Sequence, residues 1–595
     1  MYFKTAFSKT YRSGLLGAAL LLSACGGGGG GSSSDVVTPP PAPPPVSQDV
    51  VFDDKASASR FLTQATFGAG TDDIDAVIGT RSSDWFRAEL AKPATLNLPF
   101  TAAYITRDGA RNDNGNLTYQ TKQAPTFSFY RNAIEGDDQL RQRAAYALSQ
   151  IFVISHSEQG TNLFNVPDVV SHYQDILVTG AFGNFRDLLE EVTYSPAMGE
   201  WLTYRSNAKA DPRTGRVPDE NYAREIMQLF TIGLVELNND GTVKLGADGE
   251  PVETYDNEDV TGMAKVFTGL AVNPDRFYTG FGNTTYEMRT SRMTMFDSFH
   301  SDDEKAFLDA VISPGTGGEQ SITIALDTLF EHPNVGPFIG HQMIQRMTTS
   351  NPSPAYIDRV ATAFNTGRYS LPDDSIVGDG RRGDMSAMIA AIIFDPEARA
   401  ASAGSSQTFG KVREPVLRFT HWARAFDVST VTPENKGILW NTSTSLGQHP
   451  YKSPSVFNFY RPGYVPPGTQ SGEAGLTVPE FQISNTSSVA SYANFMTYFA
   501  FEFDAGNNDP DKAASFRPDY SQEMAIADDA ALLVARLDDS LTGGALSQAT
   551  KTRIETLVDA QPLAIESNPD YDGYRNRTAL AITLIMTSPD YIVQR

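Results

Sequence analysis

The chain has 595 residues, 40% of them hydrophobic, which is enough apolar material for a large globular core. Its 71 acidic and 47 basic residues give a net charge of −24, which repels phosphate backbones and excludes nucleic-acid binding as the main function. A single cysteine, Cys25, excludes a disulfide framework, a multi-cysteine zinc site and a cysteine-ligated iron–sulfur cluster.

Residues 1–24 have the features of a secretory signal peptide. Basic residues precede an apolar run that is too short to span a bilayer as a stable helix. The run ends in Leu22-Ser23-Ala24-Cys25, which resembles a bacterial lipobox. This resemblance implies that Cys25 is acylated and becomes the N-terminus of the mature protein. An ordinary cleavage site next to an incidental thiol is the alternative.

Residues 25–49 have the composition of a tether. Gly and Ser dominate its first part and Pro its second, and neither composition buries apolar area. Gly26 follows Cys25, where an Asp would mark retention in the inner membrane, so the outer membrane is the favoured destination. The sequence thus predicts a cell-envelope protein that contacts the membrane through its lipid and faces the periplasm or the cell surface.

From residue 50 onward, apolar residues recur mainly at helical spacing. In residues 137–155, for example, Leu140, Ala144 and Ile151 fall on one face. The other segments with this pattern are 168–178, 184–192, 220–232, 256–267, 321–330, 335–347, 355–364, 384–393, 413–425, 528–537 and 574–586.

Strand patterns are short and local. Residues 234–237 and 242–245 flank a turn sequence, and residues 292–296 alternate polar and apolar side chains. The expected fold class is therefore mainly α, a large multi-helix domain with small β-hairpin insertions. Residues 50–595 show no repeat of fixed period and no second linker, so we expect one helical domain, with a two-lobed body as a variant.

Several blocks of sequence follow one another along this body in a recognisable order. They include SRFLTQATFG at 59–68, NYAREIMQLFTIG at 221–233, FIGHQMIQR at 338–346, FDPEAR at 394–399 and SPDY at 588–591. Together they resemble the bacterial domain of unknown function 1800 family over roughly residues 55–595. The resemblance implies an exported, mostly helical protein, often encoded beside a second exported protein of sulfatase-like type, and it implies no particular activity.

The chain departs from the family pattern at one place. Where the family has a His-Asp pair followed by Gly and Lys, this chain has His300-Ser301-Asp302-Asp303-Glu304-Lys305. A histidine with carboxylates can bind zinc or another divalent metal, provided that three or four ligands converge. His300 and Asp302 are therefore candidate metal ligands, and a solvated acidic loop is the alternative.

The block at 221–233 opens a helix whose polar residues are candidates for a site. Asn221 and Glu225 are four residues apart and share a face, which makes Glu225 a candidate acid or base. Asn221 and Arg224 are candidate binding residues. The alternative is an ordinary acidic helix start with an ion pair between Glu220 and Arg224.

Asp259 is a second candidate catalytic carboxylate. It lies near the start of the helix expected over 256–267, where Asp256 can cap the first turn and Asp259 can complete a capping box. Capping accounts for Asp256 more fully than for Asp259.

Aromatic residues gather in residues 451–464, where Tyr460 is a candidate binding residue. Aromatic rings beside polar groups suit sugars or peptides, which stack on their faces. The alternative is a long loop held against the helices by buried rings.

Two functional hypotheses follow from these residues. The first is an envelope lipoprotein that binds a ligand or partner in surface-polymer assembly or export, because no local catalytic motif is present. The second is a metal-assisted hydrolase acting on an extracellular or periplasmic substrate, in which Glu225, Asp259 and His300 or Asp302 come together from separate segments.

Overall fold

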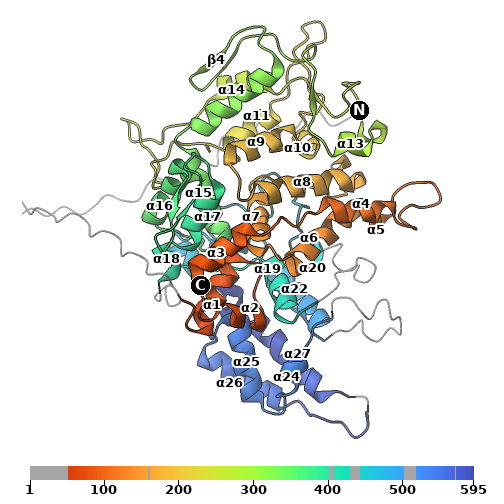
Figure 1. The fold of residues 1–595 in the computed structure, drawn as a ribbon, viewed down its shortest axis with the longest axis vertical. Helices are drawn as coiled ribbons and strands as arrows, with labels where there is room; N and C mark the ends of the chain where they lie inside the picture. Colours follow the sequence, from red (N-terminus) through yellow and green to blue (C-terminus); the bar gives the residue numbers. More distant parts are fainter. Residues whose placement is uncertain (1–50, 159–160, 401–407, 429–441, 502–516, 570) are drawn as a thin grey trace, which may run out of the picture. The chain divides into compact units, whose positions relative to one another are not determined.

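The chain is mainly α-helical, as the apolar periodicity predicts (Figure 1). The computed structural model describes residues 51–158, 161–400, 408–428, 442–501, 517–569 and 571–595. Each segment predicted to be helical contains a helix. These helices are α7 (Gln139–Ser149), α8 (Pro167–Gly180), α9 (Phe185–Tyr194), α11 (Asn221–Gln228), α12 (Asn257–Val266), α14 (Gly318–Glu331), α15 (Val335–Met347), α16 (Pro354–Thr366), α17 (Met385–Ile393), α19 (Pro415–Ala425), α25 (Ala530–Thr542) and α27 (Gly573–Met586).

Further helices lie outside the predicted segments. They are α1 (Lys55–Ala65), α2 (Thr71–Val77), α3 (Ser82–Ala91), α4 (Leu98–Thr106), α5 (Tyr119–Lys122), α6 (Ala124–Glu135), α10 (Pro196–Trp201), α13 (Tyr286–Arg289), α18 (Pro396–Arg399), α20 (Thr442–Ser445), α21 (Gln470–Glu473), α22 (Thr486–Ala500), α24 (Ser521–Met524), α26 (Gln548–Asp559) and α28 (Pro589–Ile592). Short 3₁₀ helices are η1 (Asn162–Asn165), η2 (Phe281–Asn283) and η6 (Pro479–Gln482).

Local sequence sets where individual helices begin and end, as α16 illustrates. The Ser353 hydroxyl accepts a hydrogen bond from the backbone N–H of Tyr356 at 3.2 Å, and Pro354 provides a fixed φ at the first helical position. The helix ends at Gly367, whose φ of +63° is a left-handed conformation that suits glycine. Cap chemistry therefore extends α16 slightly beyond its predicted apolar stripe.

The strands form small antiparallel pairs. They are β1 (Leu270–Ala271) with β2 (Thr294–Met295), β3 (Lys305–Phe307) with β4 (Ala310–Ile312), β5 (Tyr369–Ser370) with β6 (Ile376–Val377), and β7 (Lys411–Val412) with β8 (Val593–Gln594). The hairpin-type turn predicted between 234–237 and 242–245 is present, since a bridge joins Leu237 to Val243 and the backbone N–H of Lys244 donates to the Glu236 carbonyl at 2.8 Å. This stretch also pairs with residues 251–253, and it forms isolated bridges in place of a regular ladder.

Helix α19 lies in the interior of the described chain. It packs against α6 and α25, and Trp422 at its centre is fully buried. Because most of its residues are buried, several of its polar groups find partners inside the protein. The indole N–H of Trp422 donates to the Tyr520 hydroxyl at 3.0 Å, and His421 Nδ1 lies 2.8 Å from Arg413 Nη1.

Helices that are distant in the chain pack together within one compact unit, Val46–Arg595. Helix α1 lies beside α25 (Figure 1). Strand β7 pairs with β8, which lies at the C-terminal end of the described chain. Within the described ranges, no helix is both long enough and apolar enough to cross a bilayer. The predicted signal peptide, tether and lipidation site at Cys25 lie outside the described residues.

Candidate ligand-binding site

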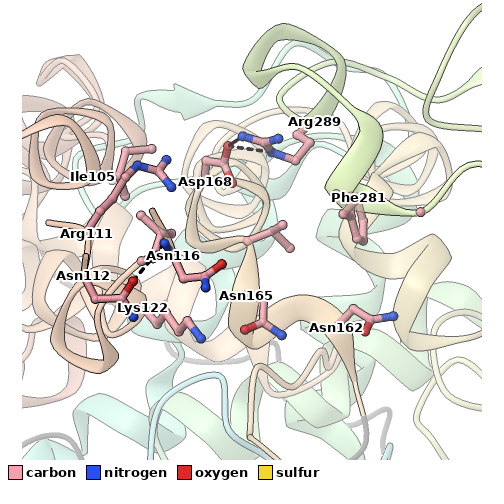
Figure 2. Close-up of a pocket in the computed structure, with 14 residues that line it drawn as sticks. Ile105, Arg111, Asn112, Asn116, Lys122, Asn162, Asn165, Asp168, Phe281 and Arg289 are labelled. Atoms are coloured by element: carbon pink, nitrogen blue, oxygen red, sulfur yellow. Dashed lines mark hydrogen bonds and ion pairs between the residues drawn. The ribbon is translucent and has the colours of Figure 1, made fainter. Parts of the chain in front are cut away.

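A cavity of about 800 Å³ lies where three segments of the chain meet (Figure 2). The segments are the loop between α4 and α5, the η1 turn with the start of α8, and the stretch that contains η2 and α13. We call it the asparagine cavity. Its lining residues are Ile105, Arg111, Asn112, Asn116, Leu117, Lys122, Asn162, Asn165, Val166, Asp168, Gly280, Phe281, Gly282 and Arg289.

The first wall is the loop between α4 and α5, which is shaped by its own polar side chains. Asn112 Oδ1 accepts hydrogen bonds from the backbone N–H groups of Asn114 and Asn116, both at 3.1 Å, as in an Asx turn. Arg111 Nη1 donates to the Gly115 carbonyl at 2.9 Å. These contacts hold Asn112 and Asn116 on one side of the cavity, as Figure 2 shows.

The second wall comes from η1 and carries two amide side chains. Asn162 Nδ2 donates to Glu200 Oε1 at 2.7 Å. The Asn165 side chain is exposed and makes no hydrogen bond with another described residue, so its amide is available to a ligand. Across the cavity, Lys122 Nζ lies 5.3 Å from the centroid of the Phe164 ring.

The third wall joins α8 to α13 through a buried ion pair. Asp168 is 1% exposed, and its Oδ2 accepts hydrogen bonds from Arg289 Nε at 2.8 Å and Nη2 at 2.7 Å (Figure 2). Arg289 Nη1 also donates to the Thr284 carbonyl at 2.8 Å. Beside this pair, the Phe281 ring lies 4.9 Å beneath the Arg205 guanidinium. This wall is therefore rigid and neutral.

The cavity as a whole is positive. Arg289 and Asp168 neutralise each other, whereas Arg111 and Lys122 form no ion pair with any described residue. In a chain of net charge −24, two unpaired cations facing one cavity attract anionic groups.

The residues predicted around α11 lie away from this cavity. Glu225 is 8% exposed, and its Oε2 has no hydrogen-bond partner among the described residues. Burial raises the pKa of Glu225, and the charge of Arg224 partly opposes that shift. Arg224 pairs with Glu220 at 3.3 Å, which is the ion pair of the alternative interpretation. Asn221 Nδ2 lies 3.4 Å from the Thr203 hydroxyl.

Both carboxylate oxygens of Asp259 have structural partners. Oδ2 accepts a hydrogen bond from the backbone N–H of Asp256 at 2.9 Å and completes a capping box. Oδ1 accepts from the backbone N–H of Leu308 at 2.5 Å, in the turn between β3 and β4. Asp259 thus fixes that turn to the start of α12.

His300 and Asp302 lie in different surroundings. The expectation of an exposed loop is wrong for His300, which is 2% exposed because the segment before β3 packs onto α14. Its Nδ1 lies 2.9 Å from the Thr268 carbonyl, and its Nε2 lies 3.2 Å from the Ser321 hydroxyl. Burial lowers the pKa of His300, which favours neutral imidazole. Asp302 is exposed and pairs with Lys209 at 2.5 Å.

A metal centre therefore lacks a ligand set in the part of the chain that the structure describes. No group of three or more His, Cys, Asp or Glu side chains there is arranged to hold a metal ion. The ring nitrogens of His300 and the carboxylates of Asp259 and Asp302 are instead occupied by protein partners.

Tyr460 belongs to the interior. It is 6% exposed, and its hydroxyl donates to Gln150 Oε1 at 3.1 Å. Within the same segment, Tyr451 is also buried, whereas Phe457 is partly exposed beneath the Arg461 guanidinium. These positions match a loop held by buried rings.

The asparagine cavity was not predicted from the sequence. Its only local sign is the polar run RNDNGN at 111–116, which reads as a turn. The other two walls come from segments about 50 and 170 residues further along the chain. The periodicity of apolar residues describes local structure and does not predict that these distant segments pack together.

Comparison with known proteins gives one match. The chain matches a family described as "Protein of unknown function (DUF1800)" over residues 60–593. No curated protein and no solved structure matches it.

Proposed function

Because the chain belongs to the DUF1800 family of proteins of unknown function, we propose a function from its own cavity. It is an exported, lipid-anchored cell-envelope protein that binds an acidic, hydroxyl-rich ligand in the asparagine cavity. The ligand class is a segment of an acidic polysaccharide, of the kind handled in surface-polymer assembly or export. A sulfatase-like exported protein is the partner that the family resemblance suggests.

The donor set of the cavity carries this proposal. Four asparagines line a cavity large enough for an oligosaccharide of a few units, and the Asn165 amide, with two donor hydrogens and an acceptor oxygen, makes no hydrogen bond with another described residue. Arg111 and Lys122 add two unpaired cations that suit carboxylate groups, and Phe281 adds an aromatic ring. Neutral sugars would use the amides but leave the cations without partners.

We expect trigalacturonic acid to bind more tightly than maltotriose, which has hydroxyls but no carboxylates. Asn165→Ala and Arg111→Gln should each weaken trigalacturonic acid binding by about tenfold, because each removes a group that a ligand can contact. Isothermal titration calorimetry of the purified protein at physiological salt measures both effects.

Asn114→Ala is the matched control, since Asn114 lies in the same loop but does not line the cavity. It should leave the affinity unchanged. Equal affinity for the two trisaccharides, or equal weakening by Asn114→Ala and Asn165→Ala, would contradict the proposed ligand class.

Membrane attachment is a separate prediction that rests on Cys25. Cys25→Ala should abolish acylation and move the protein from the outer-membrane fraction to the soluble fraction, because no thiol remains to accept the lipid. Labelling with palmitate and fractionation of cells measure this. Ser32→Ala in the tether is the control and should stay with the membrane. If Cys25→Ala is also retained at the membrane, the lipoprotein assignment is contradicted.

A further inference from the structure

A second cavity, of about 580 Å³, is lined by four arginines and lies away from the asparagine cavity. We call it the arginine cavity. Arg60 comes from α1, Arg399 ends α18, Arg413 follows β7, and Arg595 follows β8. These positions span almost the whole sequence, and the packing of α1 on α25 and of β7 on β8 brings them together.

The carboxylates that line the same cavity are already used. Asp54 caps α1 by accepting a hydrogen bond from the backbone N–H of Ser57 at 2.6 Å. Asp590 Oδ2 accepts from the backbone N–H of Ser547 at 3.0 Å and from the Thr550 hydroxyl at 2.8 Å. The charge of Asp54 acts on Arg60 and that of Arg595 acts on Asp590. Two carboxylates against four arginines still leave positive charge in excess in the lining.

Among the described residues, Arg60, Arg399 and Arg413 donate hydrogen bonds to backbone carbonyls and neutral side chains. Arg60 donates to the carbonyls of Ala400 at 3.1 Å and Arg399 at 2.9 Å. Arg399 donates to the Gln64 amide, and its buried Nε has no partner among the described residues. Arg413 donates to the Tyr591 carbonyl at 2.9 Å. Cations buried without a counter-charge are costly.

Burial lowers the pKa values of these arginines, and for Arg60 the charge of Asp54 partly opposes the shift. Burial, followed by the charge of Arg60, lowers the pKa of Arg399 to about 9. Asp395 opposes this shift, but both of its oxygens already accept hydrogen bonds from Arg359, at 2.7 and 2.9 Å. Burial also lowers the pKa of Arg60 and of Arg413.

We propose that the arginine cavity binds a phosphate monoester. A tetrahedral dianion accepts hydrogen bonds from two guanidinium groups at once, which matches Arg60 and Arg399 better than a single carboxylate would. The hydroxyls of Ser59 and Thr63 also line the cavity and supply further donors.

The size and lining of the cavity favour an ester over free phosphate. About 580 Å³ is in the range of pockets for small organic ligands and far exceeds the space of one anion. Apolar side chains, including Leu541 and Val593, line the remainder and suit an organic group. The ester can be a soluble molecule or a phosphatidic acid headgroup, which share the same phosphate chemistry.

Glycerol 1-phosphate is the soluble probe, inorganic phosphate is the minimal one, and vesicles containing phosphatidic acid are the membrane probe. We expect the purified protein to bind glycerol 1-phosphate more tightly than inorganic phosphate in calorimetry at physiological salt. Arg60→Gln should weaken this binding by at least about tenfold, and Arg60→Lys by less, because lysine keeps the charge but loses the planar fork.

Arg553→Gln is the matched control, since it removes the same charge from an exposed position on α26 that does not line the cavity. It should leave the affinity unchanged, as should Asn165→Ala in the asparagine cavity, so the two binding proposals can fail separately. Arg595→Gln, at an exposed lining position, is a second variant should Arg60→Gln unfold.

Arg60-dependent binding of glycerol 1-phosphate alone assigns a soluble ester. Arg60-dependent binding of the phosphatidic acid vesicles assigns the headgroup. Two results would overturn the proposal. The first is that no probe binds at a concentration of about 10 mM phosphate groups, because the dissociation constant would then be weaker than millimolar. The second is that Arg60→Gln and Arg553→Gln weaken binding equally, which would indicate non-specific charge attraction.

Discussion

Glu414→Ala is expected to lower the free energy of unfolding by about 3–5 kcal/mol, the cost of removing one partner from a buried ion pair. Glu414 is fully buried, and Lys411 Nζ lies 3.6 Å from its Oε1. Its Oε2 accepts hydrogen bonds from the Tyr146 hydroxyl at 2.8 Å, from Gln150 at 2.8 Å and from Gln448 at 2.7 Å. Alanine would leave these three donors without their shared acceptor.

The negative charge of Glu414 also contributes to the expected loss of stability in Glu414→Ala. Burial alone would raise its pKa, but the charges of Lys411 and Arg143 outweigh burial and keep the pKa below its ordinary value. Lys411 has a second partner, Glu480, at 3.3 Å, whereas Arg143 forms no ion pair among the described residues. The variant would therefore bury excess positive charge.

Urea unfolding followed by circular dichroism measures this loss. Glu414→Gln should lose less, since its carbonyl still accepts a hydrogen bond. Glu473→Ala, at an exposed position on α21, should change stability by less than about 0.5 kcal/mol. A loss below about 1 kcal/mol for Glu414→Ala would show that this network contributes little.

Gly262→Ala is expected to destabilise the fold by about 2–3 kcal/mol, although alanine is the better helix former by about 1 kcal/mol. Gly262 lies in α12 where β3 packs closely on the helix. A Cβ atom there would lie 1.7 Å from the Ala306 carbonyl oxygen and 2.7 Å from its carbon, so backbone would have to move. Steric overlap therefore outweighs helix propensity at this position.

Gly463→Ala provides the matched control, because an added Cβ meets nothing within 4 Å and the φ is not positive. It should be neutral or stabilise by up to about 1 kcal/mol. Thermal unfolding of both variants measures the difference. A Gly262→Ala protein as stable as the parent would mean that α12 and β3 do not pack this closely.

The sequence predicts the fold class and twelve of the helices, and it misses some helices that bury little as well as α6, which is buried on nearly all sides. In α26, Ile554 and Val558 are the buried residues, while the neighbouring Leu557 is half exposed. Two apolar contacts produce no periodic signal. The helix α22 buries Tyr492 and Phe495, but aromatic residues also favour strands, so its pattern is ambiguous.

Site residues are harder to predict than helices because their role depends on distant partners. Asp259, a candidate catalytic carboxylate, completes a capping box and accepts a hydrogen bond from the turn between β3 and β4. His300 was judged from its acidic neighbours, but Ser321 and Thr268, from α14 and the end of α12, decide its environment. The asparagine cavity joins segments about 50 and 170 residues apart, and in the arginine cavity Arg60 and Arg399 are 339 residues apart, so no local spacing reveals either cavity.

The pairing of β7 with β8 and the packing of α1 on α25 have a consequence for the order of folding. Contacts between residues so far apart in the chain form late, because the loop-closure entropy must be spent first. The pairing of β7 cannot form until residues 593–594 have been synthesised, so segments made early wait for a partner strand about 180 residues further along the chain before this part of the core closes.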